Sequence, residues 1–133
     1  MNVDGLMTIP SAFGPTETMD RLAAAVTARG LTIFARIDHA AGAGDVGMKL
    51  GPTAVLIFGN AKGGTPLMQA NQTIGIDLPL KALVWQGAAG KTFLSYNDPT
   101  WLAHRHDLGA AVRQTVAALG DALTALAAAV TAG

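Results

Sequence analysis

The sequence has no cysteine, few aromatic residues and little charge, and each shortage excludes a class of protein. Without cysteine there can be no disulfide bond, iron–sulfur cluster, thiolate zinc site or cysteine nucleophile. Nine basic residues balance nine acidic ones, so the chain lacks the positive excess of proteins that bind nucleic acid or anionic membranes. Half of the residues are apolar, which argues against disorder. The 133 residues suffice for one modest core, so we expect a single domain over 1–133.

The chain shows no secretory signal, and its most apolar segment is a poor membrane span. Asp4, Glu17 and Asp20 interrupt every apolar stretch among the first thirty residues. Residues 115–133 are apolar, but alanine is only weakly hydrophobic, and Asp121 would lie near the bilayer centre at a cost of about 2.5–3.5 kcal/mol. We therefore expect a cytoplasmic protein without a membrane span.

Hydrophobic periodicity and turn residues predict a mixture of strands and helices. Met19, Leu22, Ala23 and Val26 form one apolar stripe, which predicts a helix that begins at Pro15. Strands are expected at 4–9, 31–37, 53–58, 80–86 and 91–96, and further helices at 39–50, 65–70 and from 98 to about 109. The last two strands are expected to form a hairpin. These elements favour an α+β two-layer sandwich, with a mixed sheet of about five strands, helices packed on one face and a long C-terminal helix.

The C-terminal helix carries a heptad-like seam. Its apolar residues alternate between spacings of four and three: Val112, Val116, Leu119, Leu123, Leu126 and Val130. Such a seam packs either on the sheet of its own chain or on a second subunit. The sequence favours the first arrangement and leaves the second open.

Three motifs suggest cofactors or metals but do not fit them. Residues 42–47 match G-x-G-x-x-G, yet four residues separate them from the preceding strand and Pro52 leaves no room for a crossover helix. The glycine-rich run 59–65 lacks the order of a phosphate loop and is interpreted as a flexible surface turn. His104 and His106 are two residues apart, so on a helix they face different directions. We expect neither a cofactor nor a metal.

Asp38 and His39 are the pair in the sequence that most suggests catalysis. A carboxylate beside an imidazole at the end of a strand can support acid–base catalysis. The alternative is that Asp38 caps the following helix and His39 lies in its first turn.

Several motifs, in one order, resemble the DUF302 family, a domain of unknown function. They are residues 30–39, 52–53, 56–60, 64–68, 75–81 and 96–99, together with Trp85, Arg105 and His106. The resemblance implies a compact α+β domain that is generally dimeric, and it brings no reaction. Ala61 replaces the family's usual proline, and Gln86-Gly87 replaces its usual acidic residue.

The matching polar residues without an evident role in the core are the candidate site residues. Asp38, His39 and His106 are candidates for catalysis, and the candidates for ligand binding are Asn60, Asp77, Lys81, Tyr96, Arg105 and His106. The leading hypothesis is a homodimeric, non-enzymatic domain that binds a small anionic ligand through Lys81, Arg105 and His106. The alternatives are a small hydrolase or isomerase with a histidine general base, and a structural or partner-binding dimer built on the C-terminal seam.

Overall fold

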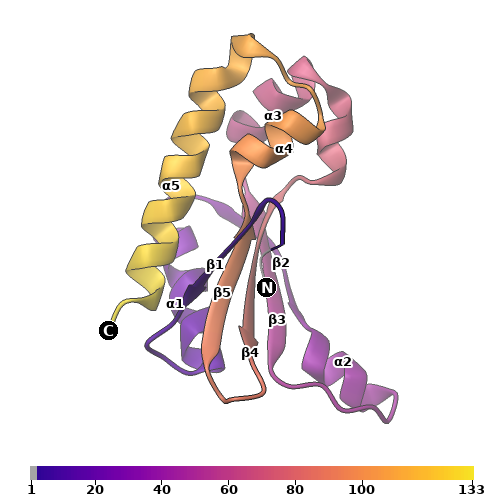
Figure 1. Cartoon of the computed structure of the whole chain (residues 1–133), viewed down its shortest axis with the longest axis vertical. Helices are drawn as coiled ribbons and strands as arrows, with labels where there is room; N and C mark the ends of the chain where they lie inside the picture. The colour runs from indigo at the N-terminus through magenta and orange to yellow at the C-terminus, as the bar shows by residue number, and fades with distance from the viewer. Residues whose placement is uncertain (1–2) are drawn as a thin grey trace.

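The structure is a computed structural model that describes residues 3–133, and its α+β architecture confirms the predicted fold class (Figure 1). The strands are β1 (Leu6–Pro10), β2 (Thr32–Asp38), β3 (Thr53–Gly59), β4 (Leu80–Gln86) and β5 (Thr92–Asn97). The α-helices are α1 (Pro15–Ala28), α2 (His39–Asp45), α3 (Ala61–Ala70), α4 (Pro99–Arg105) and α5 (Arg113–Thr131). The described residues also form two 3-10 helices, η1 (Gln72–Ile76) and η2 (Ala110–Val112).

Residues 3–133 form one five-stranded sheet in the order β1-β5-β4-β3-β2. All of its pairings are antiparallel, whereas the sequence suggested a mixed sheet. The reason is that β2 to β5 are consecutive neighbours, and each connection between them reverses the direction of the chain. Helix α1 carries the chain from β1 at one edge to β2 at the other, so it crosses the full width of the sheet.

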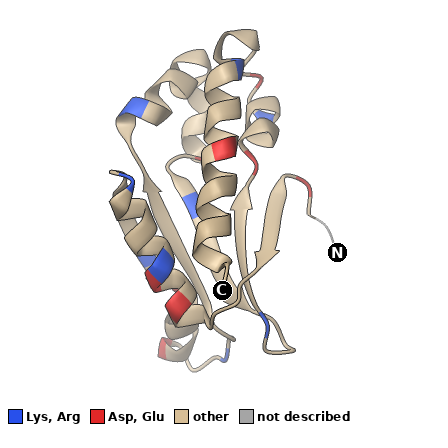
Figure 2. Ribbon diagram, turned by 90° about the vertical axis from the view of Figure 1, so that its left-hand side faces the viewer, with Lys and Arg blue, Asp and Glu red and all other residues tan. Residues whose placement is uncertain are grey.

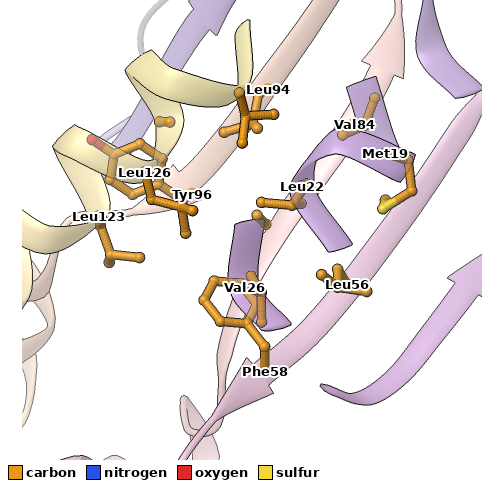
Figure 3. Packing of buried hydrophobic residues seen from close by; sticks show 13 residues of the cluster. Met19, Leu22, Val26, Leu56, Phe58, Val84, Leu94, Tyr96, Leu123 and Leu126 are labelled. Carbon is orange, nitrogen blue, oxygen red and sulfur yellow. The ribbon is translucent and has the colours of Figure 1, made fainter. Parts of the chain in front are cut away.

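Helices α1 and α5 cover one face of the sheet and bury the main core there (Figures 1 and 3). Met19, Leu22 and Val26 of α1 are buried, which confirms the predicted stripe. The seam of α5 also packs within the chain: Leu123 and Leu126 belong to the same core cluster. Residues 110–131 are the one segment within 3–133 that is long and apolar enough to cross a membrane, and their buried side faces this sheet.

A second, smaller core lies beyond the end of the sheet where β4 begins. It joins α3, η1, α4 and the start of α5, and its buried members are Leu67, Ile74, Leu102, Leu108 and Val116. The run 59–65, interpreted from the sequence as a surface turn, is largely the first part of α3. Asn60 follows the last residue of β3 and caps this helix, because its Oδ1 accepts a hydrogen bond from the amide of Gly63 at 2.6 Å.

The opposite face of the sheet carries apolar side chains over which no described helix of residues 3–133 packs. We call this the open face, and strand alternation and register assign to it Ile37, Val55, Ile57, Leu83, Trp85 and Phe93. The rings of Trp85 and Phe93 stack on it at 4.7 Å. Charges are sparse along the strands (Figure 2), and β3 and β5 contain none.

Beside the sheet, residues 39–50 form a projecting arm, which we call the α2 arm. It leaves the sheet at the end of β2 and extends on the side away from α5 (Figure 1). Its apolar side chains are strongly exposed: 72% for Val46, 68% for Met48 and 50% for Leu50. The motif at 42–47 is thus divided between a short helix and an exposed turn.

Candidate functional site

A polar cluster joins η1 to α4 at the end of the sheet where β4 begins. Asp77 follows η1, and Arg105 and His106 lie at the end of α4. Nη1 of Arg105 donates to both carboxylate oxygens of Asp77, at 2.8 and 3.0 Å. Nε2 of His106 donates to Oδ2 of the same carboxylate at 2.5 Å. The carboxylate of Asp77 therefore already occupies Arg105 and His106, two of the three side chains that the sequence hypothesis assigned to an external anion.

The cluster continues on the other side of the His106 ring. Nδ1 of His106 is 2.9 Å from the hydroxyl of Thr73, which also contacts Oδ1 of Asn71 at 3.0 Å. The Asn71 amide nitrogen donates to the backbone carbonyl of His106 at 2.6 Å. His106 is only 7% exposed, and both ring nitrogens have partners. A buried, fully satisfied network of this kind stabilises the fold and leaves no nitrogen free to act as a base.

Lys81 lies beside the cluster but does not join it through a carboxylate. Its Nζ donates to the carbonyl of Pro79 at 3.1 Å and lies 3.5 Å from the carbonyl of Asp77. The ammonium group thus binds the turn that leads into β4. The structure brings Asp77, Arg105 and His106 into direct contact, with Lys81 at the periphery.

The remaining candidates lie elsewhere. Tyr96 is a core residue, 6% exposed, whose hydroxyl lies 3.4 Å from that of Thr124. Asp38 and His39 are exposed at the opposite end of the sheet, because Asp38 pairs with Ala54 at the start of β3. Oδ1 of Asp38 accepts a hydrogen bond from the amide of Ala41 at 2.9 Å, so this carboxylate caps α2.

A cavity of about 360 Å³ opens between α3 and α5, where the two cores meet. Most of its lining is apolar and comes from the start of β2, the end of β3, the turn into β4, α3 and α5. These apolar residues are Leu31, Phe34, Phe58, Leu67, Met68, Leu78, Pro79, Leu80, Leu119, Ala122, Leu123 and Leu126. Arg29 and Asn60 add polar groups to this lining. A small cavity of this size and apolar character is typical of a site for a small organic ligand.

The glycines of α3 contribute to this space. Gly63 and Gly64 line the cavity, and a Cβ built on Gly64 would lie 3.6 Å from Leu78. The polar cluster supports the same wall, because Asp77 directly precedes Leu78 and Pro79. Of the predicted binding residues, Asn60 lines the cavity. The sequence analysis did not identify Arg29, Phe34 or Leu119 as site residues. A cavity that forms between segments distant in the chain leaves no local pattern in the sequence.

A metal site finds no support in the described part of the chain. Within residues 3–133, no three His, Asp or Glu side chains come together as ligands.

Comparisons with known proteins identify the domain. Three curated relatives, from Brucella suis biovar 1, Brucella abortus biovar 1 and Brucella melitensis biotype 1, are named fluoride-specific ion channel FluC. Each is 50% identical over 105 residues, or 79% of this chain, but these residues cover 41% of the first relative and 39% of the other two. The chain thus spans about two-fifths of the length of these relatives.

A solved structure shares the fold. The crystal structure of an uncharacterized conserved protein DUF302 from Bacillus stearothermophilus superposes with a TM-score of 0.84 at 21% identity, over 96% of this chain and 98% of that one. The family model for the domain of unknown function DUF302 matches residues 7–126. The chain belongs to the DUF302 family.

Proposed function

We propose that this chain is a small-molecule-binding domain whose ligand occupies the cavity between α3 and α5. The single observation that carries the proposal is an apolar cavity of about 360 Å³ that the two cores leave open. Close packing fills most protein interiors. A cavity of this size, bordered by leucine and phenylalanine side chains, therefore favours the binding of an apolar group, because binding removes apolar surface from water.

The polar cluster is a less suitable binding site. Its carboxylate already neutralises Arg105 and contacts His106, so an incoming anion would have to displace Asp77 from both. The same saturation argues against His106 as a general base. The channel activity in the names of the relatives belongs to proteins of which this chain covers about two-fifths, and we do not propose it for this domain.

Thermal unfolding tests the proposal. We expect amphiphiles with six to ten carbon atoms to raise the Tm of the wild-type protein, because they bind the native state. Ala122 lines the cavity yet is exposed, so Ala122→Phe should fill the space without disturbing the core and should abolish the rise in Tm. Ala125 is exposed on the same helix and does not line the cavity, so Ala125→Phe is the matched control. A rise in Tm that survives Ala122→Phe would place the ligand elsewhere, and no rise with any amphiphile would contradict the proposal.

We also propose that the domain is a homodimer, in which the open face and the α2 arm of one copy contact those of the other. Two features support this. Along the strands the open face carries mainly apolar side chains, and its one charged side chain within β1–β5 is Lys81 near the start of β4. Exposed apolar patches of this kind mark interaction sites. The α2 arm exposes Val46 and Met48 by 72% and 68%, although nothing else in the described chain packs on these side chains enough to bury them.

The area of these surfaces fits a dimer. Five strands about 4.8 Å apart and about 20 Å long present roughly 450 Å², and the α2 arm extends this toward the about 800 Å² per partner of a standard interface.

Light scattering after size exclusion tests the dimer. Val46→Asp with Met48→Asp should convert it to a monomer, because each carboxylate would be buried without a partner. Ile76 is 75% exposed and lies in η1, away from the arm and the open face, so Ile76→Asp should remain dimeric. A monomeric wild-type protein, or a dimer that tolerates both arm substitutions, would contradict this interface.

A further inference from the structure

Among the described residues 3–133, Arg29 is the one charged residue that lines the cavity. Arg29 is the C-cap of α1. Its Nη1 makes a long contact of 3.4 Å with the carbonyl of Ala25 in the same helix, and within residues 3–133 no carboxylate pairs with it. The guanidinium group is thus available to an external anion at the edge of an otherwise apolar space.

Asn60 adds a second polar group to the lining. Its Oδ1 is occupied by the amide of Gly63 at 2.6 Å. The amide nitrogen of its side chain makes no hydrogen bond to residues 3–133 and can donate to a ligand. Together Arg29 and Asn60 offer hydrogen-bond donors and positive charge, which suit a carboxylate or sulfonate head group.

Phe34 extends the apolar lining of the cavity. This side chain lies at the bulge of β2, where the register shifts between Ile33 and Ala35, and it is 55% exposed while lining the cavity. An exposed phenylalanine next to an apolar cavity can be covered when a ligand chain lies against it.

We propose that the ligand is an amphipathic monoanion: a free, monomeric molecule with an alkyl chain among the leucines and an anionic head at Arg29. This inference rests on the proposed function, because it names the class of ligand for the same cavity. Charge complementarity selects the anion: the lining includes Arg29 and no acidic residue among the described residues. A cationic amphiphile would place its ammonium group beside an unpaired guanidinium group.

Calorimetric titration of the full chain with octanoate, decanoate, 1-octanol and octylammonium, each below its micelle concentration, tests the ligand class. We expect octanoate to bind about tenfold more tightly than 1-octanol, and octylammonium to bind most weakly. Decanoate should bind more tightly than octanoate by about fourfold for each added methylene.

Substitution of Arg29 identifies the head-group contact. Arg29→Gln should weaken octanoate about tenfold and change 1-octanol less than twofold, whereas Arg29→Lys should retain most of the affinity for octanoate. Lys91 lies in the hairpin turn at the other end of the sheet, so Lys91→Gln removes an equal charge and should leave both ligands unaffected. Circular dichroism melts verify that each variant folds.

The outcomes separate the two proposals. If 1-octanol and octanoate bind equally and Arg29→Gln changes neither, the ligand class is wrong while the binding cavity stands. If none of the four compounds binds, the proposed function itself fails. Binding to vesicles of phosphatidylglycerol, without affinity for monomeric octanoate, would also overturn the inference, because it would replace a cavity ligand by a membrane surface.

Discussion

Replacing Asp77 with asparagine tests whether the polar cluster stabilises the fold. The carboxylate accepts from Nε2 of His106 at 2.5 Å and from Nη1 of Arg105 at 2.8 and 3.0 Å, and its side chain is only 15% exposed. Asparagine preserves the size of the side chain but removes the negative charge and one acceptor oxygen. Because His106 is only 7% exposed, bulk water cannot replace the charged acceptor that its ring loses.

The expected magnitude follows from these contacts. A hydrogen bond to a charged group contributes about 1.5–3 kcal/mol, and the half-exposed Arg105 adds less than about 1 kcal/mol because water screens it. We therefore expect Asp77→Asn to lower the free energy of unfolding by about 2 kcal/mol, which corresponds to a fall in Tm of about 6–8 °C. Arg105→Gln should cost less than Asp77→Asn.

Urea unfolding followed by circular dichroism measures these differences. The control is Asp20, whose side chain is 61% exposed and pairs with the exposed Arg36 at 2.7 Å. Asp20→Asn should change stability by less than about 0.5 kcal/mol. If Asp77→Asn and Asp20→Asn were equally mild, the cluster would not hold η1 against α4. It would then become a candidate binding site again.

Two further stability measurements test the core and the backbone by the same urea titration. Leu22→Ala should cost about 2–5 kcal/mol, because Leu22 is fully buried in the main core and alanine leaves a void; a loss below 1 kcal/mol would mean that the helix layer is loosely packed. Gly5→Ala should be more destabilising than Gly30→Ala. Both glycines have positive φ angles, of 75° and 74°, but a Cβ on Gly5 would lie 2.2 Å from the indole of Trp101, while that on Gly30 meets open space. The strain alone is about 1–2 kcal/mol, so equal losses would argue against the contact with Trp101.

The sequence was sufficient for the elements that local patterns determine. The stripe of α1 and the cap at Asp98-Pro99 each lie within one segment, and both helices begin where they were predicted. Helix α4 ends at Arg105, several residues before the predicted end near 109. The seam of α5 was correct as a pattern, but whether it packs on its own sheet depends on tertiary structure. Helix α3 was predicted only for residues 65–70, because the glycine-rich run 59–65 was interpreted as a surface turn. Capping by Asn60 and burial of the apolar face allow the helix to begin at Ala61 despite Gly63 and Gly64, which disfavour helices.

The site was predicted only in part. Asp77, Arg105 and His106 were grouped as candidates through the family resemblance, and the structure brings them together, but as each other's partners. Asp38 and His39 were grouped with these three residues, and that grouping was wrong. Antiparallel pairing places Asp38, the last residue of β2, at the end of the sheet opposite to the polar cluster. The cavity itself forms between segments that are far apart in the chain, so no local pattern records it.

Methyl NMR during titration with octanoate tests the central claim, that a small ligand occupies the cavity between α3 and α5. We expect saturable shifts for the leucine methyl groups that line the cavity, while Leu22 and Leu94 in the main core stay nearly unmoved. The lining leucines are Leu31, Leu67, Leu78, Leu80, Leu119, Leu123 and Leu126. Shifts confined to Leu83 on the open face, or none at all at saturating ligand, would contradict it.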